Sequence, residues 1–381
     1  MNAPIIIIGS GFGSYQLIKT IRRTDKHIPI TVFTLDDGHD YNKPDLSHAF
    51  SLQQTSADLI RQSAQEFASE YNITLHALTR VDSIDSQQQS VLVNGTAYPY
   101  SQLVLATGAK TFVPPMQGNA TNKVITLNSL QEFESAQQQL REAKRVLVIG
   151  AGLIGTEIAM DLSHCGKQIV MVEPSKGLMA NMLPELVATA LQHKLIEAGV
   201  EFEFGQTINS LDHNCSAICA TLSSGKTVDI DCVISAAGLK ANVGLARQSG
   251  CKVNNGLVVN NQLQTSVNNI YALGDCAEIN GKVMSYLQPI LLSANALAKT
   301  LLGQPTDLKL PPMLVKVKTP HMPIQLGGST VKDVASWQID IDATGCSVKA
   351  YNEQKQIIGF VVTQGHMSNT FPLLRALPAS L

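Results

Sequence analysis

The chain is poor in charged and aromatic residues and has no long uninterrupted apolar run. Charged residues make up 15% and aromatic residues 5% of its 381 positions, against 44% hydrophobic residues. Because the formal net charge is only −2, no strong overall field attracts nucleic acid or an anionic membrane. No apolar stretch reaches the length of a membrane span, and the first predicted strand leaves no room for a signal peptide. We therefore expect a soluble, cytoplasmic protein of two or three domains.

Cysteine spacing excludes two further kinds of centre. The seven cysteines stand at positions 165, 215, 219, 232, 251, 276 and 346, and no two of them form a C-x-x-C or C-x4-C pair. A redox-active disulfide of the usual kind is therefore not expected. We interpret Cys215 and Cys219 as structural residues, and the odd total fits a reducing compartment. Cysteines and histidines form no cluster with metal-ligand spacing, so no protein-bound metal is predicted.

Two glycine-rich loops are present, each between a predicted strand and a predicted helix. Residues 9–14 read GSGFGS after the apolar run IIII at 5–8, and residues 150–155 read GAGLIG after the run VLVI at 146–149. In this context the glycines let the backbone approach a pyrophosphate, whose charge is stabilised by the amides at the helix N-terminus. The alternative is that each loop is only a tight strand-to-helix turn, because the motif alone is weakly specific.

The residues that follow the two loops differ. The strand predicted at 168–172 ends in Glu173, whose carboxylate can bind an adenosine ribose and would repel a 2′-phosphate, so NADH is favoured over NADPH. After the first loop, Thr34 stands where that acid is expected and Asp36 follows closely. Ser14 also replaces the third glycine of the first loop. The first loop is therefore the looser match of the two.

Two later fragments complete a recognisable series. Residues 103–108 read LVLATG, a predicted strand that ends in Ala-Thr-Gly, and residues 270–275 read IYALGD, a predicted strand that ends in Gly-Asp. With these four elements in this order, the chain resembles the flavoproteins that have two dinucleotide-binding domains, over roughly residues 4 to 300. The resemblance implies FAD at the first loop and NADH at the second. It also implies that Asp275 binds the ribityl chain of the flavin.

The resemblance and the chain order predict an α/β fold. We expect two Rossmann-like dinucleotide-binding domains of three ββα layers and a small α+β C-terminal domain. The predicted FAD-binding domain is discontinuous, at 1–110 and 237–309; the NADH-binding domain is at 111–236 and the C-terminal interface domain at 310–381. Within the last domain, residues 347–351 and 357–362 are predicted to be a pair of strands.

The absence of cysteines at the family's redox positions reduces the number of activities that this chain can have. Without a suitable cysteine pair, a disulfide reductase is disfavoured. Other branches place one cysteine near position 48, where it cycles through sulfenic acid, but residues 41–49 read YNKPDLSHA. Peroxidase and water-forming oxidase chemistry therefore lack their usual thiol. An electron transferase remains, which takes electrons in pairs from NADH and delivers them singly to another protein.

A second resemblance covers almost the whole chain. The segment YNKPDLSH at 41–48, together with residues 287–299 and 311–320, closely resembles the rubredoxin reductases, and most of all the flavorubredoxin reductases of bacterial nitric oxide detoxification. This implies FAD as bound cofactor, NADH as donor and flavorubredoxin or rubredoxin as the protein acceptor. Two alternatives keep both loops: a ferredoxin-type reductase of an oxygenase system, and an NADH-sensing flavoprotein interaction module.

The same resemblance assigns roles near the flavin. Lys43 matches a lysine beside the isoalloxazine ring and Glu157 a glutamate on the nicotinamide side, and we hypothesise that they form an ion pair. The alternative is that Lys43 is a solvated loop residue and that Glu157 only favours a helix N-terminus. Lys318 matches a position that reaches the flavin, or it helps to dock an acidic partner. His48, Lys316 and His321 are further candidates for the acceptor face, although a lone histidine is more often structural.

The complete set of predicted site residues follows from these two resemblances. Lys43 and Glu157 are the catalytic candidates. The cofactor-binding candidates are Gly9, Ser10, Gly11, Phe12, Thr34, Lys43, Val81, Ala106, Thr107, Gly108, Gly150, Gly152, Leu153, Ile154, Gly155, Glu157, Glu173, Gly238, Gly274, Asp275, Leu287 and Lys318.

Overall fold

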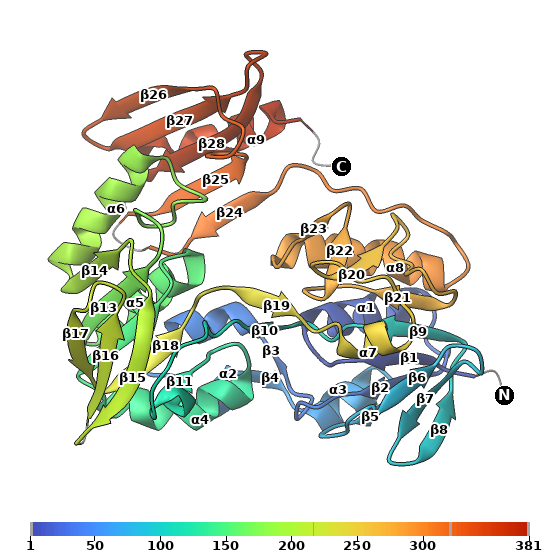
Figure 1. Cartoon of the computed structure of the whole chain (residues 1–381). Coiled ribbons are helices and arrows are strands. Elements are labelled where there is room, and N and C mark those ends of the chain that lie inside the picture. Colours follow the sequence, from blue (N-terminus) through green and yellow to red (C-terminus); the bar gives the residue numbers. More distant parts are fainter. Residues whose placement is uncertain (1–2, 216, 320–321, 379–381) are drawn as a thin grey trace. The chain divides into compact units, whose positions relative to one another are not determined.

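The structure is a computed structural model that describes residues 3–215, 217–319 and 322–378. The chain forms two compact units. The first unit comprises residues 1–43, 56–110 and 239–309, and the second comprises residues 44–55, 111–238 and 310–381. The chain thus leaves the first unit after Lys110 and returns to it at Leu239 (Figure 1). The predicted FAD-binding domain (1–110 and 237–309), the predicted NADH-binding domain (111–236) and the separate C-terminal domain (310–381) stay predictions.

The first unit is built on a five-stranded parallel sheet. The sheet has the order β21-β9-β1-β2-β5, with Ile5 opposite both Ile30 and Gln102. Its elements are β1 (Ile5–Ile8), α1 (Phe12–Thr24), β2 (Ile30–Phe33), β3 (Asp40–Tyr41), α2 (Ser56–Leu59), β4 (Ile60–Gln62), α3 (Ala64–Glu70), β5 (Thr74–His76), β6 (Ser83–Asp85), β7 (Ser90–Val93), β8 (Thr96–Pro99), β9 (Gln102–Leu105), β10 (Ala109–Thr111), β19 (Leu239–Ala241), α7 (Gly244–Gln248), β20 (Leu257–Val259), β21 (Ile270–Ala272), β22 (Ala277–Ile279), β23 (Lys282–Val283) and α8 (Leu287–Leu301). All four residues of β1 are buried, as expected for the central strand of a parallel sheet.

The second unit repeats this plan around another five-stranded parallel sheet. Its order is β11-β18-β12-β13-β14, and a five-stranded antiparallel sheet of order β24-β25-β28-β27-β26 follows later in the chain. The elements are η1 (Lys43–His48), which begins at the last residue of the first stretch of the first unit, η2 (Thr121–Lys123), β11 (Val124–Ile125), α4 (Leu130–Glu142), β12 (Arg145–Ile149), α5 (Leu153–His164), β13 (Gln168–Glu173), α6 (Glu185–Glu197), β14 (Val200–Phe204), β15 (Ile208–Asn214), β16 (Ala217–Leu222), β17 (Thr227–Ile230), β18 (Cys232–Ser235), β24 (Leu314–Val317), β25 (Ile324–Gly328), β26 (Ser336–Asp342), β27 (Gly345–Tyr351), β28 (Ile357–Thr363), η3 (Gln364–Asn369) and α9 (Thr370–Ala376).

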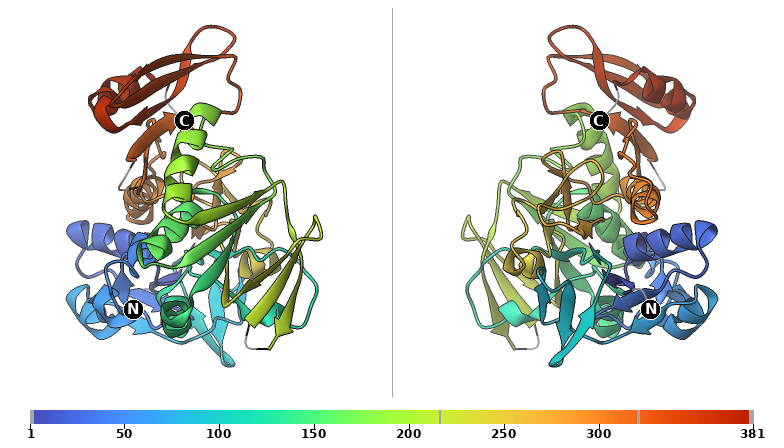
Figure 2. Two further views of the ribbon diagram at one scale, coloured as in Figure 1. Left: turned by 90° about the vertical axis from the view of Figure 1, so that its left-hand side faces the viewer. Right: turned by 90° about the vertical axis from the view of Figure 1, so that its right-hand side faces the viewer.

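A second sheet packs on the parallel sheet of this unit. The antiparallel sheet β15-β16-β17 contributes Leu211, Ala220 and Val228 to one apolar cluster, together with Leu147 of β12 and Val170 of β13. Figure 2 shows this smaller sheet beside the strands of the parallel sheet. The antiparallel sheet, the parallel sheet and the helices therefore form the three ββα layers of this unit. The predicted α/β fold class is confirmed.

The predicted strand pair near the C-terminus is also confirmed. Strands β27 and β28 are antiparallel, with Val348 opposite Val361. Helix α9 covers one face of their sheet, because Leu373 and Leu377 pack with Phe360 and Val362 in one apolar cluster. This segment therefore has a small core of its own.

Both glycine-rich loops lie at equivalent points of the two parallel sheets. Strand β1 lies between β9 and β2, and strand β12 lies between β18 and β13. At such a central strand the chain crosses to opposite sides of the sheet, and ligands of α/β proteins bind at the carboxyl ends of the strands there. The fold thus places each loop where a dinucleotide is normally bound.

Candidate functional site

The first loop has the geometry of a phosphate cradle. Gly9 has φ +114°, and a side chain there would clash with the carbonyl oxygen of Ala106, so only glycine fits. At Gly11 an added Cβ would meet nothing within 4 Å, which leaves open space beside the helix. Gly11 is also the N-cap of α1, without a side-chain cap and without an acid in the first turn. The uncapped amides can therefore bind an anionic pyrophosphate.

The second loop repeats this geometry with a complete set of glycines. Gly150 has φ +102°, and a Cβ there would lie 2.7 Å from the carbonyl oxygen of Ala236. A side chain at Gly155 would clash with the carbonyl oxygen of Gly150, whereas Gly152 faces open space. Gly152 is the uncapped N-cap of α5, whose first turn has no acid. The second unit therefore also carries a cradle that fits a pyrophosphate.

Two buried hydroxyls near the loops have no hydrogen-bond partner in the described part of the chain. Ser14, at the third-glycine position of the first loop, is fully buried, and Thr156, directly after Gly155, is also fully buried. The Oγ of Ser14 and the Oγ1 of Thr156 are without partners there. A buried hydroxyl without a partner is unfavourable, which is consistent with sites completed by a ligand or ordered water.

The predicted ribose positions are organised differently in the two units. Glu173 accepts hydrogen bonds from the amide of Ala151 at 2.8 Å and from the amide of Ser175 at 2.9 Å. The hydroxyl of Ser175 donates a third hydrogen bond to Glu173, at 2.6 Å. A carboxylate has about four acceptor sites, so Glu173 orders the second loop and keeps capacity to accept from a ribose. In the first unit, Thr34 Oγ1 lies 2.8 Å from Ser10 Oγ. Burial, and then the charge of Asp37, raises the pKa of Asp36 to about 6.

The Ala-Thr-Gly turn is fixed by hydrogen bonds within the first unit. Thr107 Oγ1 donates to the carbonyl oxygen of Asn242 at 2.7 Å, and Asn242 Nδ2 donates back to the carbonyl oxygen of Thr107 at 2.9 Å. Gly108 has φ +62° and Gly238, at the matching turn of the second unit, has φ +106°. Asn242 was not among the predicted site residues, because nothing in its local sequence distinguishes it.

Lys43 lies beside the predicted ribityl-binding acid. Its Nζ is 3.6 Å from Asp275 Oδ2, and the two side chains are 36% and 15% exposed. Lys43 is the last residue of the first stretch of the first unit, and Asp275 lies shortly after β21 in the same unit. Lys43 and Glu157 belong to different units, and the ion pair between them stays a hypothesis.

Glu157 is the centre of a small polar cluster within the second unit. It is 4% exposed; its Oε2 accepts from Ser47 Oγ at 3.0 Å and its Oε1 from the amide of Lys318 at 3.1 Å. Burial raises the pKa of Glu157, although the hydrogen bonds from Lys318 and Ser47 oppose the shift. His48 Nε2 lies 3.8 Å from Glu157 Oε2, and burial lowers the pKa of His48 to about 4. The imidazole is therefore neutral at pH 7, and its buried Nε2 has no hydrogen-bond partner among the described residues.

A second buried acid on α5 was missed by the sequence reading. Asp161 is 3% exposed and accepts from the amides of Phe50 at 3.0 Å and Ser51 at 3.2 Å. Burial raises its pKa. Because Asp161 stands one helical turn after Glu157, both carboxylates face residues 44–55. This explains why residues 44–55, which we predicted in the first domain, belong to the second unit.

The remaining predicted residues are placed as follows. Phe12 begins α1, Leu153 begins α5 and Ile154, which is 49% exposed, lies in the same turn; Val81 is buried, Leu287 begins α8 and is 36% exposed, and Gly274 has φ +81°. Lys318 follows β24, and its Nζ donates to the carbonyl oxygen of Pro44 at 2.9 Å. Lys316 lies on β24 opposite Gln325. His321 lies outside the described residues.

Three observations limit other kinds of site. The seven cysteines are all free, and burial raises the pKa of Cys276, which directly follows Asp275. Across the described ranges, no three His, Cys, Asp or Glu side chains gather as a metal site would require. Within the same ranges, no helix is both long and apolar enough to span a bilayer.

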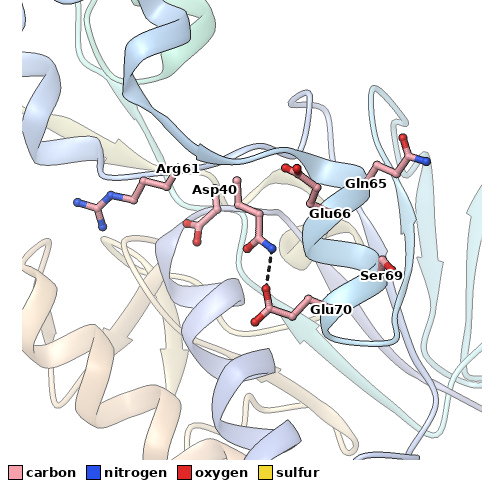
Figure 3. A pocket seen from close by; sticks show the side chains of 7 residues that line it. Asp40, Arg61, Gln65, Glu66, Ser69 and Glu70 are labelled. Atoms are coloured by element: carbon pink, nitrogen blue, oxygen red, sulfur yellow. Dashed lines mark hydrogen bonds between the residues drawn. The ribbon is translucent and has the colours of Figure 1, made fainter.

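One hollow on the first unit lies apart from the predicted cofactor residues. It has a volume of about 740 Å³ and is lined by side chains of β3, β4 and α3 (Figure 3). Several of the polar groups that line it already have partners: Gln62 Nε2 donates to Glu70 Oε2 at 2.7 Å, and Asp40 pairs with Lys19, outside the hollow, at 2.7 Å. We therefore assign no role to this hollow.

Comparison with known proteins identifies the family. Residues 3–295 match the family model of the pyridine nucleotide-disulphide oxidoreductases. The chain belongs to this family. Its cofactors are accordingly FAD and NADH, as predicted. Residues 307–377 match a second model, the rubredoxin binding C-terminal domain.

Relatives of similar length carry one name. A protein of Aliivibrio fischeri named nitric oxide reductase FlRd-NAD(+) reductase is 54% identical over 99% of this chain and 99% of its own length. A protein of Escherichia coli with the same name is 45% identical over 99% of this chain and 100% of its own length. The predicted resemblance to the flavorubredoxin reductases is thus confirmed.

Solved structures share the fold. A ferredoxin reductase from Rhodopseudomonas palustris has a TM-score of 0.86 and 26% identity, covering 95% of this chain and 91% of that one. The covalent complex of putidaredoxin reductase with putidaredoxin matches with a TM-score of 0.88 at 22% identity, over 98% and 92% of the two chains. The second likeness concerns the fold alone.

Proposed function

We propose that this chain carries electrons from NADH through FAD to the rubredoxin centre of a flavorubredoxin, in the detoxification of nitric oxide. The observation that carries the proposal is a link within the second unit. Lys318 lies in the segment that matches the rubredoxin binding domain, and its amide donates to Glu157 on the helix that follows the second loop. The acceptor-binding segment and the NADH-binding helix thus share one buried carboxylate. A cytoplasmic location is part of this proposal, because NADH is an intracellular reductant.

The residues of the two loops do the binding in this proposal. FAD, when bound, supplies a ring that accepts electrons in pairs and releases them singly, so the protein needs only to hold and tune it. The amides at the start of α1 would hold the FAD pyrophosphate and those of α5 the NADH pyrophosphate. Glu173 would accept from the NADH ribose while its bond to Ala151 keeps the loop in shape. Fixing both reactants in this way makes electron transfer between them effectively unimolecular.

The charged groups have distinct roles in the proposal. Asp275 would accept a hydrogen bond from the ribityl chain, and Lys43, 3.6 Å from Asp275, would supply positive charge close to it. Glu157 is buried, and burial raises the pKa of its carboxyl group, because the charged form is poorly solvated in the protein interior. Ser47 and the Lys318 amide hold its carboxyl in one orientation.

The state of the cysteines supports the proposal that electrons leave the flavin for another protein. In this chain no cysteine stands between residues 41 and 49, and the thiols are free. Cys276 is fully buried and its raised pKa keeps it protonated and unreactive. Electrons that reach the flavin therefore have no protein thiol of the usual kind to pass through.

The decisive experiment offers iron proteins to the NADH-reduced enzyme. The purified FAD-containing protein is reduced with NADH without oxygen and mixed with flavorubredoxin, isolated rubredoxin or a ferredoxin, while the iron absorbance is followed. We expect flavorubredoxin to be reduced fastest. A zinc-loaded rubredoxin domain is the control, since zinc occupies a tetrahedral thiolate site without redox chemistry. Reduction of the ferredoxin alone would overturn the proposal.

One specific observation favours a second candidate function. The chain has a TM-score of 0.86 with a solved ferredoxin reductase, at 26% identity. A ferredoxin-type reductase of an oxygenase system would use the same two loops and differ in its acceptor. The same mixing experiment separates the two, because each predicts a different preferred iron protein.

A further inference from the structure

Residues 175–183, which connect β13 to α6, contact the second glycine-rich loop; we call this segment the strap. The amide of Met179 donates to the carbonyl oxygen of Ala151 at 2.8 Å. The amides of Met182 and Leu183 donate in turn to the carbonyl oxygen of Met179, at 2.7 Å and 2.9 Å. Met179 and Leu183 are each 2% exposed. The strap therefore forms a turn whose buried residue Met179 is bonded to the loop.

The first end of the strap is fixed to the predicted ribose acid. The amide and the hydroxyl of Ser175 both donate to Glu173 Oε1, at 2.9 Å and 2.6 Å. Glu173 Oε2 accepts from the amide of Ala151 at 2.8 Å. Ala151 is thus hydrogen-bonded through its amide to Glu173 and through its carbonyl group to Met179. The loop is held between the acid and the strap.

Met179 has a backbone conformation that a methionine rarely adopts. Its φ is +49°, in the left-handed region where a residue with a Cβ is disfavoured. Such a conformation persists only where the surrounding structure holds it, and it is frequent at ligand-binding segments. The position of the strap therefore depends on contacts that come from outside the strap.

One such contact comes from the C-terminal segment. Thr330, just after β25, is 4% exposed, and its Oγ1 donates to the carbonyl oxygen of Met182 at 2.7 Å. Trp337 Nε1 donates to the carbonyl oxygen of Thr330 at 3.3 Å, which ties Thr330 to β26. Thr330 belongs to residues 307–377, which match the rubredoxin binding C-terminal domain. One hydroxyl thus joins that segment to a strap 148 positions away in the sequence.

We propose that Thr330 is a positioning residue for the NADH site and acts through the strap on the second glycine-rich loop. Without its hydroxyl, the carbonyl oxygen of Met182 loses a donor and the left-handed conformation of Met179 loses part of its support. The bond from Met179 to Ala151 then opens more often. NADH has to order the loop as it binds, and this ordering weakens binding. The inference rests on the proposed NADH site of the second unit and does not depend on the electron acceptor.

Three variants of the full FAD-containing protein test this role. Thr330→Val removes the hydroxyl and keeps a side chain of similar shape, whereas Thr330→Ser keeps the hydroxyl. Thr363→Val is the matched control, because Thr363 is 1% exposed on the same antiparallel sheet. Its Oγ1 accepts from the amide of Cys346 at 2.9 Å. The control therefore removes a buried hydroxyl of the C-terminal segment that is not bonded to the strap.

NADH binding is measured from the rate of flavin reduction against NADH concentration, without oxygen and without an acceptor protein. Thr330→Val should raise the half-saturating concentration roughly 3- to 10-fold, which is more than it lowers the plateau rate. The Kd of oxidised NAD, measured by calorimetry, should rise by a similar factor. Thr330→Ser should recover most of this loss, and Thr363→Val should change neither quantity. Equal effects of Thr330→Val and Thr363→Val would indicate a general loss of stability and would overturn the proposal.

Hydrogen exchange tests the strap in the absence of NADH. In Thr330→Val the amide of Met179 should exchange at least ~3-fold faster, because its bond to Ala151 opens more often; Thr363→Val should leave this rate unchanged. Gly155→Ala, which disturbs the loop itself, separates this inference from the NADH site on which it rests. If Gly155→Ala weakens NADH binding and Thr330→Val does not, the positioning role is wrong and the site stands. If neither variant weakens it, both are wrong.

Discussion

Replacing Asp161 by alanine removes the carboxylate that holds residues 44–55 to α5. The buried amide of Phe50 and the more exposed amide of Ser51 lose their acceptor, at 3.0 Å and 3.2 Å respectively. A hydrogen bond to a charged group is worth about 1.5–3 kcal/mol. Water can replace the acceptor at Ser51 but not readily at Phe50, and relief of the buried charge, seen in the raised pKa of Asp161, offsets part of the loss. We expect a net local destabilisation of about 2–3 kcal/mol.

Hydrogen exchange measures this effect where it occurs. A loss of that size raises the exchange rates of the Phe50 and Ser51 amides roughly 30- to 150-fold. Asp161→Asn keeps one acceptor oxygen and should give about half the loss in free energy. A local measurement is preferable because a chain of two units need not unfold in a single transition.

The control for this prediction is Glu197→Ala in the same unit. Glu197 makes an exposed ion pair with Lys194 at 3.0 Å, a kind of pair that contributes at most about 1 kcal/mol. Exchange at Phe50 and Ser51 should not respond to it. If Asp161→Ala changes these two rates by less than about twofold, the carboxylate does not hold residues 44–55 and the reasoning is refuted.

Three other changes give separate tests. Gly155→Ala adds a Cβ that clashes with the carbonyl oxygen of Gly150 and should weaken NADH binding at least ~10-fold while FAD content is retained, as titration and absorbance would show. Glu173→Ala removes the acceptor of the Ala151 amide, so the preference for NADH over NADPH should fall in steady-state kinetics. Because the folded-state pKa of Glu157 is raised, its contribution to stability is fully present below the unfolded pKa of about 4.3 and is lost as pH rises through the folded pKa. Glu157→Gln should therefore flatten the decline in stability over that interval in urea unfolding; an unchanged pH profile would count against the assignment.

The fold followed from local patterns in the sequence because its main elements obey local rules. The runs at residues 5–8 and 146–149 are apolar throughout, as buried parallel strands must be. The glycines after them are needed where another backbone segment approaches within contact distance, at Ala106 and Ala236. These requirements act over a few residues, so the strand, loop and helix of each cradle could be predicted.

Pairings between distant residues could not be predicted in the same way. Thr107 and Asn242 exchange two hydrogen bonds across 135 positions of sequence, and neither residue has a local feature that announces the other. Lys43 was predicted as a catalytic residue, but its contact with Asp275 required the return of the chain to the first unit. Such contacts depend on how distant segments of the chain come together in the fold, and a short window of sequence does not contain that information.

Asp161 is the exception, because a local signal for it existed. Helix α5 has eight consecutive buried residues, from Gly155 to Leu162, and Glu157 and Asp161 are the two acids among them. A carboxylate is rarely buried unless hydrogen-bond donors reach it, so two acids four positions apart on a buried helix predict that one segment supplies donors to both. That segment is residues 44–55, whose Ser47, Phe50 and Ser51 provide them. Helix α5, which begins at the second glycine-rich loop, therefore also holds residues 44–55 in place through these hydrogen bonds.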